Sequence, residues 1–215
     1  MGMRGLHPDA ALQKHDMKSP QTLPQSFYLR DDIIAVSRDL LGKVLCTEIG
    51  GMHTSVVITE TEAYAGVTDK ASHAFGDRRT RRTEPMYGPG GSAYVYLCYG
   101  IHHLFNVVTN ESGVPHAVLV RAGEVHCGLA TILERRGKPA PDRALLAGPG
   151  SLARALGITT ELTGSSLLEG PIWIEDHGLR IDGAHIDVGP RVGIDYAEED
   201  AARPYRFLLE PGALR

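Results

Sequence analysis

The feature that most constrains the fold is a long polar segment, residues 65–91, set between two strand-like runs. The run before it (residues 52–61, MHTSVVITET) and the run after it (residues 92–98, SAYVYLC) are rich in β-branched and aromatic residues, which favour β-strands. A loop this long in a compact domain is usually functional or mobile. We therefore expect residues 58–106 to carry the function, with the rest of the chain as their scaffold.

The remaining sequence predicts one domain of mixed helices and strands, because 215 residues are enough for one sizeable core and marginal for two. Gly50-Gly51 predicts a hairpin between strands at residues 43–49 and 52–61, and the second strand should end where Glu62 and Tyr64 enter the loop. The other predicted elements are helices at 31–41, at 129–136 and after an N-cap at Ser151, and strands at 92–98, 103–110, 116–122, 171–175, 188–194 and 203–209.

The N-terminal segment, residues 1–25, is polar and has no hydrophobic periodicity, so we expect a flexible tail followed by a domain at residues 26–215. The segment lacks the apolar core of a signal peptide. The longest apolar runs are too short to span a membrane. We therefore expect a cytosolic protein without membrane contact, and nothing in the sequence demands a dimer, so we expect a monomer.

The charge pattern limits how the chain can bind nucleic acid. The formal net charge is −4, which argues against binding through bulk positive charge. A local basic face remains available, because Arg78, Arg79, Arg81 and Arg82 lie within five residues. The chain contains no phosphate-binding GxxxxGK[ST] loop, no GxGxxG opening a helix and no GxSxG, so nucleotide hydrolysis, redox chemistry and ester hydrolysis have no support.

A pair of carboxylates lies just before the loop. Glu60 and Glu62 are two residues apart, so in a regular strand they point to the same face. Two carboxylates at such a place can act as an acid–base pair, or one can be reactive while the other is a solvated charge. A third interpretation is a metal site that adds Asp69 and His73, although the histidines lack the helical spacing typical of metal ligands.

Aromatic residues are dense in the same stretch. Tyr94 and Tyr96 share one face of their predicted strand, and Tyr64, His73 and Tyr99 lie nearby in the sequence. A single tyrosine usually fills a core with its hydroxyl at the rim. Aromatic rings beside an arginine cluster, however, are typical of proteins that stack bases and hold phosphates.

In combination, these motifs resemble those of the alkyladenine (3-methyladenine) DNA glycosylases of the mammalian type. The similarity covers roughly residues 25–210 and keeps its order along the chain. The matching motifs are ETEAYAG at 60–66, Asp69, the Ser-His pair ending at His73, Met86-Tyr87, YVYLCYG at 94–100, Asn106, VLVRA at 118–122, AGPGSLARAL at 147–156, RVGI at 191–194 and RPYRF at 203–207.

The resemblance implies a single α+β domain with a curved, mostly antiparallel β-sheet flanked by helices. It also implies a monofunctional glycosylase that needs no cofactor and removes alkylated or deaminated purines from damaged duplex DNA in base excision repair. The expected substrates are 3-methyladenine and 7-methylguanine, with hypoxanthine and ethenoadenine as further candidates. A neutral lesion would need protonation or hydrogen bonding as it leaves, and the sequence offers no obvious acid for that step.

The resemblance also implies roles for individual residues. Glu62 would be the general base that activates water for attack on C1′, and Arg121 would help to orient that water. Tyr64, His73 and Tyr96 would stack on the flipped purine. Tyr99 would enter the minor groove and fill the vacated space, and Asn106 would crowd the 2-amino group of guanine. We expect the arginines at 78, 79, 81 and 82 to contact DNA phosphates.

Two other classes of function remain open at this point. The same aromatic and arginine residues could form a non-catalytic nucleic-acid-binding module, in which Glu62 would be dispensable. Alternatively, Glu60, Glu62, Asp69 and His73 could build a metal-dependent hydrolase, which a chelator would inactivate. The glycosylase interpretation predicts resistance to chelators and an absolute need for Glu62.

Overall fold

Strand β3 (Met52–Ala65) is the axis of the fold in the computed structural model, which describes residues 20–214. One edge of β3 pairs first with β2 (Val44–Ile49) and then with β9 (Arg206–Leu209), while the other edge pairs with β6 (His116–Cys127). All three pairings are antiparallel. Because both edges are occupied, side chains near the middle of β3 are held within the sheet rather than at its border.

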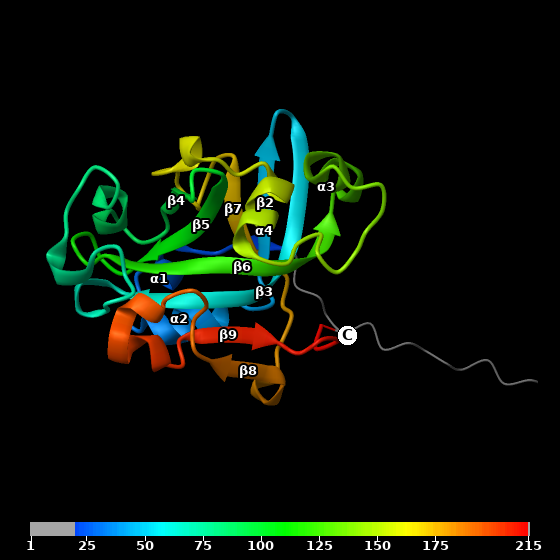
Figure 1. The fold of residues 1–215 in the computed structure, drawn as a ribbon. Coiled ribbons are helices and arrows are strands. Elements are labelled where there is room, and N and C mark those ends of the chain that lie inside the picture. Colours follow the sequence, from blue (N-terminus) through cyan, green and yellow to red (C-terminus); the bar gives the residue numbers. More distant parts are fainter. Residues whose placement is uncertain (1–19, 215) are drawn as a thin grey trace, which may run out of the picture.

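The sheet has the strand order β1-β7-β2-β3-β6-β5-β4, and β8 joins it through β9 (Figure 1). Every strand pairing within residues 20–214 is antiparallel. The remaining strands are β1 (Gln21–Thr22), β4 (Ala93–Cys98), β5 (His102–Thr109), β7 (Ile172–Asp176) and β8 (Ile186–Gly189). The α-helices are α1 (Gln25–Tyr28), α2 (Ile33–Asp39), α3 (Leu129–Arg136) and α4 (Pro149–Leu156). The predicted fold class, a single α+β domain with a mostly antiparallel sheet, is confirmed.

Local sequence explains how several elements begin and end. Asp32 caps α2, because its carboxylate accepts the backbone N–H groups of Ile34 and Ala35. Gly50 and Gly51, with φ values of 65° and 71°, form the predicted hairpin turn, a conformation that favours glycine. None of the helices described in residues 20–214 is long and apolar enough to cross a membrane.

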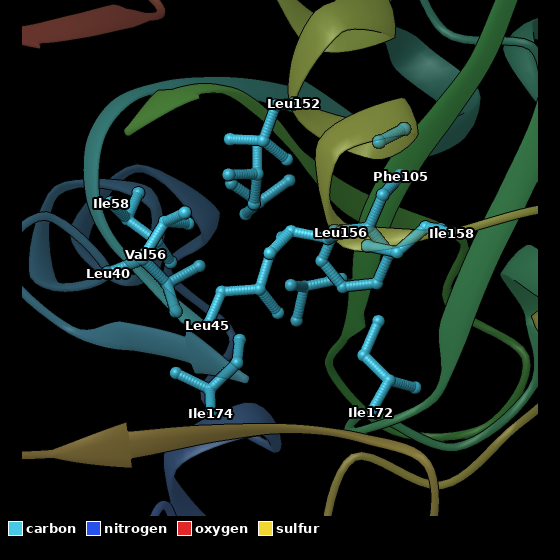
Figure 2. Close-up of a cluster of buried hydrophobic side chains, with 14 of the residues drawn as sticks. Leu40, Leu45, Val56, Ile58, Phe105, Leu152, Leu156, Ile158, Ile172 and Ile174 are labelled. Carbon is cyan, nitrogen blue, oxygen red and sulfur yellow. The ribbon is translucent and has the colours of Figure 1, made fainter. Parts of the chain in front are cut away.

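The main core lies between the sheet and helix α4. Leu152 and Leu156 of α4 point at Leu45 of β2 and at Ile172 and Ile174 of β7, and all five are fully buried (Figure 2). Burial of large aliphatic side chains contributes roughly 1.5–3 kcal/mol each, so this layer is the main source of stability. The opposite face of β4, β5 and β6 is thereby left free for other residues.

The predicted long loop is confirmed, since residues 66–91 contain only short 3₁₀ turns. The loop is nevertheless anchored. Met86 and Tyr87 are buried in a second, smaller apolar cluster with Tyr94 of β4 and Val108 of β5, on the face opposite α4. The loop therefore covers one end of the sheet and encloses space there, next to the segment that follows β8 (Figure 1).

Three predicted boundaries are wrong. Strand β3 continues to Ala65, because β6 and β9 pair with it along residues 60–65, so Glu62 and Tyr64 lie inside a strand rather than at its exit. Helix α4 is capped by Gly148 and has Pro149 as its first residue, so Ser151 is not the N-cap. The strands expected at 188–194 and 203–209 are shorter: β8 lies earlier, at 186–189, and β9 begins later, at Arg206.

The predicted N-terminal tail, residues 1–25, extends too far at its C-terminal end. Residues 1–19 lie outside the part of the chain that the structure describes. Residues 21–22, however, form β1 and pair with β7, and α1 begins at Gln25. These residues therefore belong to the folded sheet and not to a tail.

Candidate active site

Alternate side chains of four neighbouring strands form one wall of a cavity of about 340 Å³. Because side chains alternate across a strand, residues two apart reach the same face, opposite the α4 core. The strand residues of this wall are Tyr64, Tyr94, Tyr96, Cys98, Leu104, Asn106, Ala117, Leu119 and Arg121. The 66–91 loop and the segment after β8 complete the lining with Ala71, His73, Arg82, Met86, Val192, Gly193, Ile194 and Tyr196, and Tyr99 of the β4–β5 turn joins the rim.

Three aromatic residues of the lining pack against one another on the cavity wall. The His73 and Tyr96 ring centroids are 4.6 Å apart, and the Tyr94 ring lies 5.6 Å from that of Tyr96. The hydroxyl of Tyr94 lies 2.9 Å from Nδ1 of His73 and fixes the imidazole. Burial, together with Arg82 and Arg78, lowers the pKa of His73 to about 4, so the ring is neutral at neutral pH. The three predicted stacking residues, Tyr64, His73 and Tyr96, therefore line the same cavity.

Glu62 is completely buried behind the cavity wall. Its Oε1 accepts the backbone N–H of Val192 at 2.8 Å, and its Oε2 accepts the hydroxyl of Tyr64 at 2.9 Å. Nη1 of Arg121 lies 3.3 Å from Oε1. Burial raises the pKa of Glu62 above its ordinary value, although these three partners act to lower it. Glu62 does not itself line the cavity, but Tyr64, Arg121 and Val192, which hold it, all do.

The second carboxylate of the pair, Glu60, shares Arg121 with Glu62. Oε1 of Glu60 accepts Nε–H of Arg121 at 2.8 Å and Nε–H of Arg206 at 2.6 Å. The prediction that Glu60 and Glu62 point to the same face is confirmed, since both contact one guanidinium. A charged residue in an apolar strand usually has a partner, and Arg121 has two.

The four residues considered as metal ligands do not converge. Arg191 binds both carboxylate oxygens of the buried Asp69, and Asp69 also accepts the backbone N–H groups of Ala65 and Ala71. His73 faces Tyr94 rather than a carboxylate. Within residues 20–214, no group of three or more histidine, cysteine, aspartate or glutamate residues is arranged to hold a metal ion.

Tyr99 stands at the tip of the β4–β5 hairpin, with 92% of its surface exposed. Its φ of 50° lies in the left-handed region, which is uncommon for a residue other than glycine, and Gly100 follows with a φ of 73°. The hairpin thus holds an aromatic ring outward at the cavity mouth. Asn106, on β5, is buried in the same wall, where its Nδ2 donates to the carbonyl of Tyr94 at 3.2 Å.

The four clustered arginines are all exposed but have different surroundings. Arg82 lines the cavity, with its guanidinium 5.0 Å from the centre of the Tyr96 ring. Arg78 and Arg82 also line a neighbouring hollow of about 410 Å³ together with Lys70. Arg79 instead forms a salt bridge with Glu84 at 2.9 Å. Arg81 lines neither hollow.

Several residues of this site were not predicted. Arg191, Val192 and Arg206 belong to the motifs RVGI and RPYRF, which carry part of the family resemblance, but neither motif indicates a role by its composition. Two of them contact the carboxylate pair because the fold brings distant segments together. Val192, in the segment after β8, contacts Glu62, and Arg206, in β9, contacts Glu60 because β9 pairs with β3. The antiparallel pairing of β9 with β3 is the signal that would have identified Arg206.

The chain is similar in sequence to proteins of one known family. Residues 26–212 match the sequence model of the family described as Methylpurine-DNA glycosylase (MPG). The chain is 47% identical over 188 residues to a protein of Chlamydia felis named "Putative 3-methyladenine DNA glycosylase", with 87% of this chain and 95% of that protein covered. Proteins with the same name from Desulfitobacterium hafniense (45% over 195 residues) and Bacillus cereus strain AH820 (46% over 198 residues) also match, each with 87% of this chain and 95% of the relative covered.

These three relatives are bacterial, so they support the family but do not confirm the narrower mammalian type. The family match spans nearly all of the described residues, including every residue of the cavity and of the carboxylate pair behind it. The chain therefore belongs to the methylpurine-DNA glycosylase family, whose members are DNA-repair hydrolases that cleave the N-glycosidic bond.

Proposed function

We propose that this protein is a monofunctional glycosylase that flips 3-methyladenine and 7-methylguanine out of duplex DNA and releases them by Glu62-activated attack of water on C1′. The observation that carries the proposal is a buried carboxylate, held by an arginine and a tyrosine, directly behind a cavity lined by aromatic residues. The narrower, mammalian-type assignment is also part of this proposal and rests on the motif resemblance alone.

The cavity, with its aromatic lining, suits a flipped purine. A base within a duplex hides its glycosidic bond, so it must leave the stack at a cost of a few kcal/mol. Stacking on aromatic side chains returns about 1–3 kcal/mol per base. Tyr64, His73 and Tyr96 are the proposed stacking residues, and the neutral state of His73 avoids placing a second full charge beside a cationic, N-alkylated purine. Asn106 is proposed to crowd the 2-amino group of normal guanine.

Glu62 is the proposed general base. A base must be ionised to accept a proton, and its pKa should lie near the working pH, which burial favours here by raising the pKa of Glu62. Arg121 lines the cavity and contacts Glu62, so it can orient a water molecule between the carboxylate and C1′. Each oxygen of Glu62 accepts one of these bonds, from Tyr64 or Val192, so a water molecule would use a remaining lone pair beside one of them.

The leaving group needs little help when the purine is alkylated, because the ring already carries a positive charge. For hypoxanthine or ethenoadenine the departing base would have to be protonated or hydrogen-bonded. His73 is a poor acid at neutral pH, since its pKa is about 4. We therefore propose that cationic lesions are released faster than neutral ones.

Damaged duplex DNA is the proposed partner. Tyr99 is suited to act as the wedge, because its ring is exposed at a hairpin tip beside the cavity, and an inserted ring partly offsets the cost of flipping. Arg78 and Arg82 are the best placed of the four arginines to bind phosphates beside the flipped nucleotide. With a net charge of −4, we expect modest and strongly salt-dependent affinity.

The experiment that tests this function is base release from a methylated DNA duplex in the presence of EDTA. Wild-type protein is expected to release 3-methyladenine, while Glu62→Gln should bind the duplex but release base about 10²–10⁴-fold more slowly, the usual contribution of a general base. Subtraction of spontaneous release without enzyme is the control.

The same assay distinguishes the two other classes of function. If neither protein releases base and both bind DNA equally, the chain is a nucleic-acid-binding module and the catalytic assignment is wrong. If EDTA abolishes the activity of wild-type protein, a metal-dependent mechanism replaces the one proposed.

A further inference from the structure

Glu60 lies where two arginines meet. Only 7% of its surface is exposed, and one oxygen atom, Oε1, accepts Nε–H from both Arg121 and Arg206. Glu60 itself does not line the cavity, but one of its two partners, Arg121, does. A buried carboxylate needs such partners, but these two also link it to the proposed general base, because Arg121 contacts Glu62 as well.

The backbone aims Glu60 at Arg121. The pairing of β3 with β6 shifts register on both sides of Glu60, between Ile58 and Glu60 and again between Glu60 and Thr61. Such irregularities re-aim side chains and are frequent next to active sites. The shift allows Glu60 and Glu62 to approach one guanidinium from neighbouring positions on β3.

The hydrogen bond at Nε determines how Arg121 presents the rest of its guanidinium. The group is planar and its N–H donors form a rigid fork, so a carboxylate that holds Nε also fixes the direction of both terminal nitrogens. Arg121 consequently offers Glu62 a single contact, at 3.3 Å from Nη1. The Asp69–Arg191 pair illustrates the alternative: both terminal nitrogens of Arg191 bind both oxygens of Asp69.

The charges around Glu62 balance. The titratable and charged groups that surround it are Glu60 and Tyr64 from β3, Arg121 from β6, Arg206 from β9 and Arg191 from the segment after β8. Arg191 is neutralised by Asp69. Glu60 and Glu62 then balance Arg121 and Arg206, so loss of the Glu60 charge would leave a net positive field on the carboxylate of Glu62.

We propose that Glu60 is a positioning residue for the proposed reaction: it holds Arg121 by Nε and shares its charge, so that Arg121 orients water without closing a two-pronged pair with Glu62. The inference rests on the proposed function of Glu62 as general base. A two-pronged pair would add a charged N–H donor to each oxygen of Glu62, beyond the bonds from Val192 and Tyr64, and make Glu62 a weaker base.

The test compares two substitutions that change the charge around Glu62 in opposite directions. Glu60→Gln removes a negative charge and Arg206→Gln removes a positive one. We expect Glu60→Gln to slow single-turnover release of 3-methyladenine on the order of tenfold to a hundredfold at neutral pH, since small misplacements of catalytic groups have effects of this size. The acid limb of the pH–rate profile, where the rate falls as pH drops, should move to lower pH in Glu60→Gln. Arg206→Gln should change the rate by less than about fivefold, because the ion pair of Arg206 with Glu60 is partly exposed. Because it removes a positive charge, it should move the acid limb to higher pH.

Asp200→Asn is the matched control, because Asp200 is another buried carboxylate that pairs with an arginine, Arg203, at 2.7 Å. It should lower the melting temperature without moving the acid limb. Unchanged limbs in both Glu60→Gln and Arg206→Gln, or shifts in the same direction, would overturn the inference. If Glu60→Gln does not fold, the shift in Arg206→Gln decides: a higher limb supports the inference and an unchanged limb contradicts it.

A carbon-13 NMR titration of glutamate carboxyl groups, with the Glu62 signal assigned from Glu62→Gln, separates this inference from the proposed function. If the Glu62 signal titrates at lower pH in Glu60→Gln while wild-type protein releases no base, the electrostatic link from Glu60 to Glu62 is supported and the glycosylase proposal fails. If wild-type protein releases base but the Glu62 titration is the same in both proteins, the positioning role fails and the glycosylase proposal stands.

Discussion

Two buried carboxylate–arginine centres lie close together in this fold, and they have opposite electrostatic character. At the first, Arg191 binds both oxygens of Asp69, and two backbone N–H groups add to them. Although burial raises its pKa, these hydrogen bonds outweigh burial, and the pKa of Asp69 lies below the ordinary value. At the second, burial outweighs the partners of Glu62 and its pKa is raised.

The difference shows how a fold separates structure from reactivity. Asp69 is satisfied on every side, so its ionised form is strongly favoured and the pair joins the 66–91 loop to the segment after β8. Glu62 has weaker contact with its arginine and lies directly behind a cavity. Perturbed pKa values that combine burial with a specific charged partner are typical of functional sites. The comparison therefore predicts that only Glu62 is reactive.

The largest expected effect is on stability. Asp69→Asn leaves Arg191 buried without its counter-charge, which should lower the free energy of unfolding by about 3–5 kcal/mol. Because the pKa of Asp69 is lowered by folding, its stabilising effect exists above the unfolded pKa and disappears as pH falls through the folded pKa. Urea unfolding of Asp69→Asn and wild-type protein at pH 7 and under acidic conditions measures both effects.

Glu62→Gln should behave in the opposite way in the same unfolding experiment. Folding raises the pKa of Glu62, so its contribution to stability is fully present below the unfolded pKa and is lost as pH rises through the folded pKa. At neutral pH, Glu62→Gln should therefore be at least as stable as wild-type protein. Equal destabilisation by Glu62→Gln and Asp69→Asn would contradict the distinction between a structural Asp69 and a reactive Glu62.

A second contrast of the same kind separates two exposed hairpin residues. Tyr99 is 92% exposed at the β4–β5 turn beside the cavity, whereas Met52 is 47% exposed at the β2–β3 turn far along the sheet. Tyr99→Ala should reduce base flipping, read by a fluorescent base analogue next to the lesion, about tenfold or more, since stacking contributes about 1–3 kcal/mol. Duplex binding should change less. Met52→Ala should change neither, and an equal loss of flipping and binding in Tyr99→Ala would contradict the wedge assignment.

The smallest expected effect concerns the arginines. Arg79 already has a carboxylate partner in Glu84, while Arg78 lines the hollow beside the cavity and forms no salt bridge within residues 20–214. Arg78→Gln should therefore reduce the slope of log binding constant against log salt concentration by about 0.9, the value for one phosphate contact. Arg79→Gln should change the slope much less. Equal slopes for the two variants would show that pairing with Glu84 does not separate their roles.

The elements that local pattern determines could be predicted from the sequence. The hairpin at Gly50-Gly51, the shared face of Tyr94 and Tyr96, and the long loop between β3 and β4 all follow from residue type and periodicity. The family resemblance adds the fold class, Glu62 behind the cavity, and six residues that line it: Tyr64, His73, Tyr96, Tyr99, Asn106 and Arg121.

What could not be predicted depends on contacts between distant segments. Strand β3 extends past Thr61 because β6 and β9 pair with it there, and no local signal in ETEAYA shows this. The burial of Glu62 and the positions of Val192 and Arg206 follow from that pairing. The arginines at 78–82 likewise form one uniform cluster in the sequence. The structure separates Arg79, which pairs with Glu84, from Arg78, which lines the hollow beside the cavity.

The most direct test of the central claim is the pH dependence of single-turnover 3-methyladenine release by wild-type protein, corrected for spontaneous release. Glu62 must be ionised to act as a base, so the rate should fall as pH drops through a pKa above the ordinary value for glutamate, about 4.3. That limb should be absent from the residual activity of Glu62→Gln and remain in Asp69→Asn. A limb that persists in Glu62→Gln, or that vanishes in a folded Asp69→Asn, would contradict the assignment of Glu62 as the reactive carboxylate.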